Sequence, residues 1–156
     1  MTNKHIDFFE FNNTIFSMIR EISHKIDLLL LEMSNELDLT PLQIKIIISL
    51  YASEEDVSIG NLGKIIGVTG GNISNICKKL EKKDFVKRVR SEDDERVVNV
   101  ELTEKGIDAS KLVGKYFETI RKDFPNEQFG ANLDTIIEEL KRLDLLLDKY
   151  ISRRGL

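Results

Sequence analysis

The feature that most constrains the fold of this 156-residue chain is a pair of short helical segments joined at a glycine. Residues 59–66 follow Ser58, a favoured N-cap, and end at Gly67, a residue favoured just after a helix. The next segment follows Thr69 as its N-cap and continues to about Lys83. The apolar positions that would pack one helix on the other are Leu62, Ile66, Val68, Ile73 and Ile76. This pattern predicts a helix-turn-helix over 59–78 with Gly63 at the crossing, although any packed helical corner shares it.

The second helix of this pair begins with Gly70 and Gly71, each costing about 1 kcal/mol relative to alanine. Three explanations fit two glycines here: a loop, a phosphate cradle, or a helix end that approaches another molecule closely. A nucleotide-binding loop fails because no GxGxxG follows a strand and no GK[ST] occurs. The free N–H groups of a helix N-terminus attract phosphate, so the glycines predict close approach to DNA. The candidate DNA-contacting residues around them are Thr69, Asn72, Ser74, Asn75 and Lys78.

The net charge of the chain argues against a nucleic-acid partner, but the charge of one segment favours it. The whole chain carries a net charge of −4, whereas residues 78–90 carry +5. Their seven basic residues are Lys78, Lys79, Lys82, Lys83, Lys87, Arg88 and Arg90. A basic face on an acidic protein is the footprint of nucleic-acid binding, and a solvated helix face is the alternative. The phosphate-contacting candidates are Lys78, Lys79, Arg88 and Arg90.

The N-terminal segment predicts a long helix. Residues 6–36 contain no Pro or Gly and predict one helix of roughly 45 Å. Such a helix is longer than a small domain is wide, so we expect it to bury its overhang on another subunit. A shorter helix follows from Pro41 to about Ser53, with Thr40 as N-cap and Gln43 closing a capping box.

The C-terminal half adds two strands and two helices. The strand-like runs 85–90 and 97–102 enclose the polar loop SEDDER, and the second run alternates apolar and polar residues. Thr103 is the expected N-cap of a helix that ends at Pro125, and a last helix is expected over 127–152. The predicted order is four helices, two strands and two helices.

Residues 68–106, VTGGNISNICKKLEKKDFVKRVRSEDDERVVNVELTEKG, resemble the multiple-antibiotic-resistance regulator (MarR) family of winged helix-turn-helix transcription factors. LEKKDFVKR is similar to the family's helix-to-strand junction, DER to the D-x-R of its wing and LTEKG to its following helix. LTPLQ is similar to its second helix. The resemblance implies a mainly α winged helix-turn-helix fold, with a dimerisation helix at 1–38, a DNA-binding lobe at 39–103 and dimerisation helices at 104–156.

The same resemblance places Arg96 at the wing tip, in the minor groove, with Asp94 aiming it. An arginine there meets a concentrated negative potential. Two departures from the family pattern, Glu92 instead of Pro and Glu95 instead of a second Arg, predict a wing that phosphate repels. The alternative for Asp94 and Arg96 is an exposed ion pair.

We therefore expect a homodimeric, cytoplasmic transcriptional regulator, a repressor that binds double-stranded DNA at a pseudo-palindromic operator. The resemblance adds a small-molecule effector between dimer and DNA lobes. The alternative class is a winged-helix module that binds a protein partner and not DNA, which the acidic wing and net charge favour. No catalytic arrangement is present in the sequence, so we expect neither an enzyme nor a cofactor, and the apolar runs are too short for a membrane span.

Two further candidates for a functional role are Cys77 and the cluster around His24. Cys77 lies on the apolar stripe of its helix and is expected in the core, with a redox-sensing thiol as the alternative. A single cysteine excludes a disulfide framework and a cysteine-based zinc site. His24 with Glu21 and Asp27 suggests a metal site only weakly, because the chain has two histidines in all.

Overall fold

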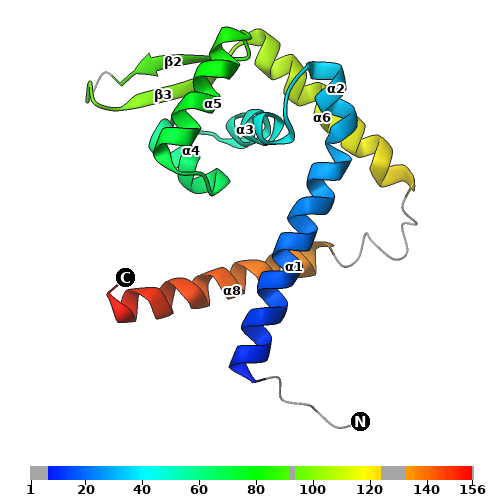
Figure 1. Ribbon diagram of the computed structural model, residues 1–156, viewed down its shortest axis with the longest axis vertical. Coiled ribbons are helices and arrows are strands. Elements are labelled where there is room, and N and C mark those ends of the chain that lie inside the picture. Colours follow the sequence, from blue (N-terminus) through cyan, green and yellow to red (C-terminus); the bar gives the residue numbers. More distant parts are fainter. Residues whose placement is uncertain (1–6, 92–93, 124–132, 156) are drawn as a thin grey trace. The chain divides into compact units, whose positions relative to one another are not determined.

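The computed structural model describes residues 7–91, 94–123 and 133–155 (Figure 1). The described elements are α1 (Phe8–Leu29), α2 (Leu31–Leu37), α3 (Pro41–Ala52), β1 (Val57–Ser58), α4 (Ile59–Ile66), α5 (Gly70–Lys82), β2 (Val86–Arg90), β3 (Val98–Leu102), α6 (Glu104–Asp123) and α8 (Leu133–Arg154). The chain forms two compact units, Met1–Gly114 and Lys115–Leu156. The predicted mainly α fold is confirmed.

The core of the first unit is built around α3. Ile44, Ile46 and Ile47 of this helix are at most 1% exposed. Burying a side chain of this size stabilises a fold by about 1.5–3 kcal/mol. The predicted capping box is present: Thr40 Oγ1 accepts from the Gln43 N–H at 3.3 Å, and Gln43 Oε1 accepts from the Thr40 N–H at 3.0 Å. The N-terminus of α3 is therefore fixed in place.

The single N-terminal helix predicted over 6–36 is wrong. The chain breaks at Leu30, which separates α1 from α2. Leu30 and Met33 are 1% and 4% exposed, whereas none of the residues of α1 is buried. The break directs the side chains of Leu30 and Met33 toward the core. We attribute the break to the burial of these two side chains. At 1.5 Å per residue α1 spans about 33 Å instead of 45 Å.

The wing is a three-stranded antiparallel sheet in the order β1-β3-β2. β2 and β3 confirm the two predicted strands, with Val86 opposite Leu102. β1 was not predicted, because two residues are too few to show alternation. It pairs Val57 with Val100, and both side chains are buried.

The last two helices differ from the prediction mainly at their ends. α6 begins after Thr103, whose Oγ1 accepts from the Gly106 N–H at 3.1 Å, as expected of an N-cap. The predicted end at Pro125 and the predicted start of the next helix at Glu127 lie outside the described residues. α8 continues two residues beyond the predicted Ser152, and none of its residues is buried.

Candidate nucleic-acid interface

The turn between α4 and α5 has the geometry that its glycines predicted. Ser58 Oγ accepts from the Asn61 N–H at 3.2 Å at the start of α4. Gly67 ends that helix with φ at 73°, a left-handed conformation that favours glycine. A Cβ on Gly63 would lie 2.9 Å from the Val68 carbonyl oxygen. Gly63 therefore permits the close crossing of the two helices.

α5 presents one face to the core and another to solvent. Ile73, Cys77 and Leu80 are completely buried. The exposed positions include most of the predicted DNA-contacting residues: Thr69, Gly70, Gly71, Asn72, Asn75, Lys78 and Lys79, with Ser74 half-buried. The structure therefore brings these residues together along one helix.

Thr69 occupies the N-cap position of α5, but its side chain makes no capping hydrogen bond. The predicted N-cap position is therefore correct, although the side chain leaves the first N–H groups of α5 uncapped. Because the first N–H groups of a helix have no partner within the helix, the opening turn of α5 keeps free donors. An anion that reaches this turn finds those donors available.

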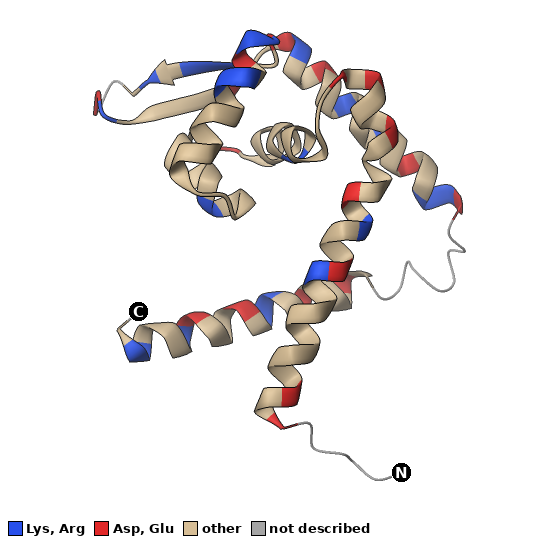
Figure 2. Ribbon diagram, in the orientation of Figure 1, with Lys and Arg blue, Asp and Glu red and all other residues tan. Residues whose placement is uncertain are grey.

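The basic run gathers on α5 and β2 (Figure 2), and ion pairs divide it into two groups. Lys83 Nζ lies 2.8 Å from Asp38, Lys87 Nζ lies 2.7 Å from Glu101, and Arg88 pairs with Glu81. The members without an ion pair among the described residues are Lys78, Lys79, Lys82 and Arg90. These four are the charges of the run left for an external anion.

Arg88, a predicted phosphate contact, has a structural partner instead. Its Nη2 and Nε lie 2.7 and 2.8 Å from Glu81 Oε2, and its backbone N–H donates to Glu81 Oε1 at 3.0 Å. The Arg88 guanidinium holds the pKa of the Glu81 carboxyl below its usual value. Arg88 thus fastens the middle of β2 to α5.

The wing loop is ordered by Asp94 through the backbone. Asp94 Oδ1 accepts from the Arg96 N–H at 2.9 Å, and the Asp94 carbonyl accepts from the Val97 N–H at 2.9 Å. The expected contact was with the guanidinium, and neither that contact nor the alternative ion pair forms between these two described residues. Arg96 and Glu95 are exposed, whereas Glu92 lies outside the described residues.

Residues 29–112, more than half of the chain, match the sequence model of the family described as transcriptional regulator SarA/Rot. The chain belongs to the SarA/Rot family of transcriptional regulators.

Curated relatives agree with this membership. The HTH-type transcriptional regulator SarZ of Staphylococcus haemolyticus is 31% identical over 106 residues, which are 68% of this chain and 70% of that protein. SarZ of Staphylococcus aureus matches a shorter stretch, 39% identical over 61 residues, or 39% of this chain and 41% of that protein.

Solved structures agree as well. The complex of S. aureus MepR with DNA is 26% identical, with a TM-score of 0.58, over 80% of this chain and 98% of that one. Apo MarR of E. coli, at 23% identity and a TM-score of 0.66 over 80% and 94% of the two chains, shows the shared fold. The MarR-type winged helix-turn-helix expected from the sequence is therefore confirmed.

The fold of this SarA/Rot-family regulator does not itself require glycine at the start of α5. A Cβ at Gly70 or Gly71 would meet no atom within 4 Å, and neither residue has a positive φ. The packing of the described residues therefore gives no reason for two glycines at this position.

We expect Gly70→Ala and Gly71→Ala to raise the free energy of unfolding or leave it unchanged, since alanine gains up to about 1 kcal/mol in a helix. Affinity for duplex DNA should nevertheless fall, because the added methyl group blocks backbone approach. Thermal unfolding and DNA titration of the same variants test both halves. Greater stability with unchanged affinity would assign the glycines another role.

The structure gives Cys77 and the acids near His24 structural roles. Cys77 is 0% exposed, and burial raises the pKa of its thiol to about 11, which confirms it as a core residue. Glu21 pairs with Lys25 at 2.6 Å and Asp27 with Lys45 at 2.7 Å. The described residues contain no cluster suited to a metal ion, and none of the helices they form is long and apolar enough to cross a membrane.

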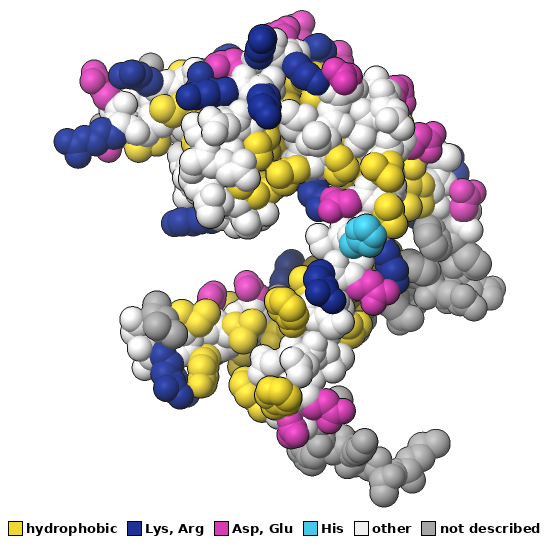
Figure 3. All heavy atoms as spheres, viewed as in Figure 1, with side chains coloured by type: hydrophobic (Ala, Val, Ile, Leu, Met, Phe, Trp, Pro, Cys, Tyr) yellow, Lys and Arg dark blue, Asp and Glu magenta, His cyan; other side chains and the backbone are white. Residues whose placement is uncertain are grey.

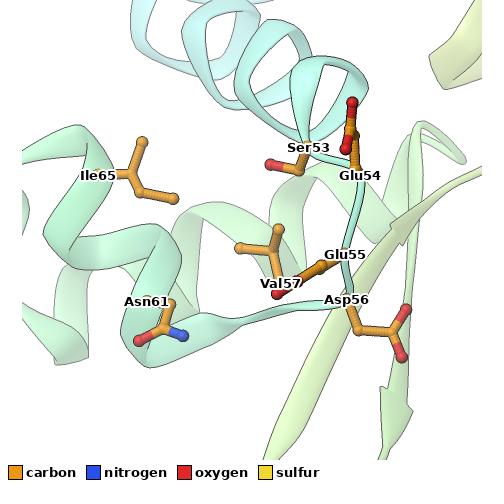
Figure 4. A pocket seen from close by; sticks show the side chains of 7 residues that line it. All are labelled: Ser53, Glu54, Glu55, Asp56, Val57, Asn61 and Ile65. Carbon is orange, nitrogen blue, oxygen red and sulfur yellow. The ribbon is translucent and has the colours of Figure 1, made fainter.

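One hollow near α4 was not predicted. Its volume is about 440 Å³, and it is lined by Ser53, Glu54, Glu55, Asp56, Val57, Asn61 and Ile65 (Figure 4). The three carboxylates would repel phosphate. We therefore exclude this hollow from the candidate DNA interface.

Proposed function

We propose that this regulator binds double-stranded DNA as a homodimer and represses transcription at a pseudo-palindromic operator in the cytoplasm. The observation that carries the proposal is the opening turn of α5, where Gly70 and Gly71 leave the backbone bare beside exposed polar side chains. A structural neighbour, MepR, was solved as a DNA complex. Two copies would place their α5 helices in half-sites ~34–36 Å apart.

Each candidate residue has a proposed role. Asn72, Ser74 and Asn75 contact base edges, and the amide of asparagine suits adenine in particular. Lys78, Lys79 and Arg90 contact phosphates, and Arg96 enters the minor groove while Asp94 orders its loop. We propose that Arg88 positions the wing and contributes less to phosphate contact, because Glu81 already holds it.

The salt dependence of binding tests this function. Log affinity for a mixed pool of duplex DNA should fall linearly with log salt, because bound phosphates release counterions. Lys78→Ala should reduce the slope by roughly 2 in a dimer, where each residue counts twice. Lys122→Ala, which removes an exposed lysine outside the basic run, is the matched control and should leave the slope unchanged.

A flat salt response would favour the alternative, a winged-helix module that binds a protein partner. The exposed acids Asp94 and Glu95 in the wing favour that reading. If DNA binds, selection of bound sequences from random duplexes would identify the operator. The effector implied by the MarR resemblance stays a prediction.

Exposed apolar side chains on α1 and α8 support the dimer (Figure 3). On α1, Phe16, Met18, Ile19 and Ile22 are at least 50% exposed. On α8, Ile136, Leu140 and Tyr150 are exposed to a similar extent. Apolar stripes of this kind bury themselves against a partner. We propose that α1 and residues 104–156 form the dimer and that the DNA-binding lobe is 39–103, with α2 assigned to the core of the first unit.

We expect a dimer in sedimentation at micromolar concentration. Ile22→Asp should raise the dimer dissociation constant by about tenfold or more, because it buries a charge in the apolar contact. Ile65→Asp is the control, since Ile65 is 58% exposed and lies on α4. A monomeric wild type would contradict the proposal, and so would equal effects of the two substitutions.

A further inference from the structure

A second hollow lies between the N-terminus of α3 and the outer side of α5. Its volume is about 490 Å³. It is lined by Thr40, Gln43, Ile76, Lys79, Lys82 and Lys83. The described lining contains ammonium, amide and hydroxyl groups and no carboxylate.

Gln43 is the decisive residue of this hollow. It is only 7% exposed, and the capping box fixes its Oε1 against the Thr40 N–H at 3.0 Å. Among the described residues no atom accepts a hydrogen bond from its Nε2. The two N–H donors of Nε2 therefore have no protein acceptor. Nε2 is not sealed from solvent, since Ser34 Oγ alone among the described residues is a fully buried side-chain polar atom without a partner, so Nε2 can donate to water or to an anion in the hollow.

The positive charge around Gln43 favours a negatively charged hydrogen-bond acceptor. Lys79 and Lys82 are exposed and form no ion pair within the described parts of the chain. Lys83 is partly neutralised by Asp38, whose Oδ2 lies 2.8 Å from its Nζ. The positive end of the α3 dipole adds to the field. An acceptor placed here meets donors and positive charge together, which is the chemistry of an anion site.

We propose that the hollow between α3 and α5 binds a phosphate group through Gln43 Nε2, Lys79 and Lys82. The phosphate comes either from the DNA backbone, in which case the inference rests on the proposed function, or from a free phosphorylated molecule. Both sources offer the same oxygens to the same donors.

Inorganic phosphate is the first probe, titrated into the full chain against chloride at equal ionic strength. The NMR signals of the Gln43 side-chain amide should shift and saturate with phosphate but not with chloride. Lys79→Ala and Lys82→Ala should each weaken the phosphate affinity by about tenfold, the usual effect of losing a charge-assisted hydrogen bond. Lys64→Ala removes the same charge from an exposed lysine on α4, which does not line the hollow, and should have no effect on phosphate binding.

Gln43→Glu is the sharpest variant. Glutamate also closes a capping box, so α3 keeps its N-terminus, while the donor amide becomes a carboxylate that repels phosphate. The variant should fold and lose phosphate binding.

Duplex DNA is the second probe and separates the two sources. A shift of the Gln43 amide on addition of duplex identifies the DNA backbone as the source. Saturation by inorganic phosphate with no shift on addition of duplex identifies a free phosphorylated molecule. Unchanged Gln43 signals with both probes overturn the inference, and so does phosphate binding that survives in Gln43→Glu. Either result leaves DNA binding through the first turn of α5 to be judged by its own salt dependence.

Discussion

Gly106→Ala is expected to lower the free energy of unfolding of the first unit by about 3 kcal/mol, because it overpacks a contact between backbones. A Cβ at this position would lie 2.1 Å from the Phe85 carbonyl oxygen and 3.0 Å from Leu102 Cδ2. The carbonyl cannot move away freely, since it accepts from the Thr103 N–H at 3.2 Å. The better helix propensity of alanine returns only about 1 kcal/mol.

The surrounding junction explains why α6 comes so close at this point. Thr103 Oγ1 donates to the Asp84 carbonyl at 2.6 Å, and Lys105 Nζ donates to the Lys83 carbonyl at 2.8 Å. Lys105 also lies over the Phe85 ring, 4.4 Å from its centre. These contacts hold the N-terminus of α6 against the turn between α5 and β2, so a methyl group there must displace the backbone at Phe85.

Gly114→Ala is the matched control, because Gly114 lies on the same helix and a Cβ there would meet no atom within 4 Å. That variant should unfold at the same or a higher denaturant concentration. Urea unfolding followed by circular dichroism measures both. Equal stability of Gly106→Ala and the wild type would show that the junction is looser than its distances indicate.

Arg96→Ala is expected to weaken DNA binding by about 1–3 kcal/mol per subunit, with little change in the stability of the fold. Arg96 is the only basic residue of the loop SEDDER, and it is exposed. Without it, the loop has no positive charge that can enter the minor groove, where an arginine meets concentrated negative potential.

Asp94→Ala should also weaken binding, although it removes a negative charge. The Asp94 carboxylate accepts from the Arg96 N–H at 2.9 Å, a turn contact that fixes where the arginine leaves the loop. Pure electrostatics predicts the opposite sign, because phosphate repels a carboxylate. The direction of the change therefore distinguishes loop ordering from charge.

Glu95→Ala supplies the control for charge alone. Glu95 is the neighbouring exposed acid and has no hydrogen bond or ion pair among the described residues. Its removal should tighten DNA binding, and Glu95→Arg should tighten it further with a steeper salt dependence. Titrations of the selected operator with these four single variants measure the sign of each change. Tighter binding by Asp94→Ala would remove Asp94 from the wing mechanism.

The sequence by itself determined the elements whose signals are local. The cap at Ser58, the capping box of Thr40 with Gln43, and the left-handed Gly67 were all predicted correctly. Each depends on a side chain and a backbone group within three or four residues of one another, or on the backbone freedom of one glycine. The spacing of apolar residues likewise predicted the helix pair and the two longer strands.

Only the tertiary structure decided which groups pair across distant parts of the chain. Lys83 meets Asp38 across 45 positions, and Arg88 turns to Glu81 although both lie in or beside the basic run. The break at Leu30, the short strand β1 and the reason for Gly106 also depend on elements remote in sequence. A local sequence pattern reflects the conformations that the backbone of one segment can adopt. The partner of a long charged side chain depends instead on which other segment lies beside it in the folded protein. The open donors of Gln43 appear only once α3 and α5 are packed together.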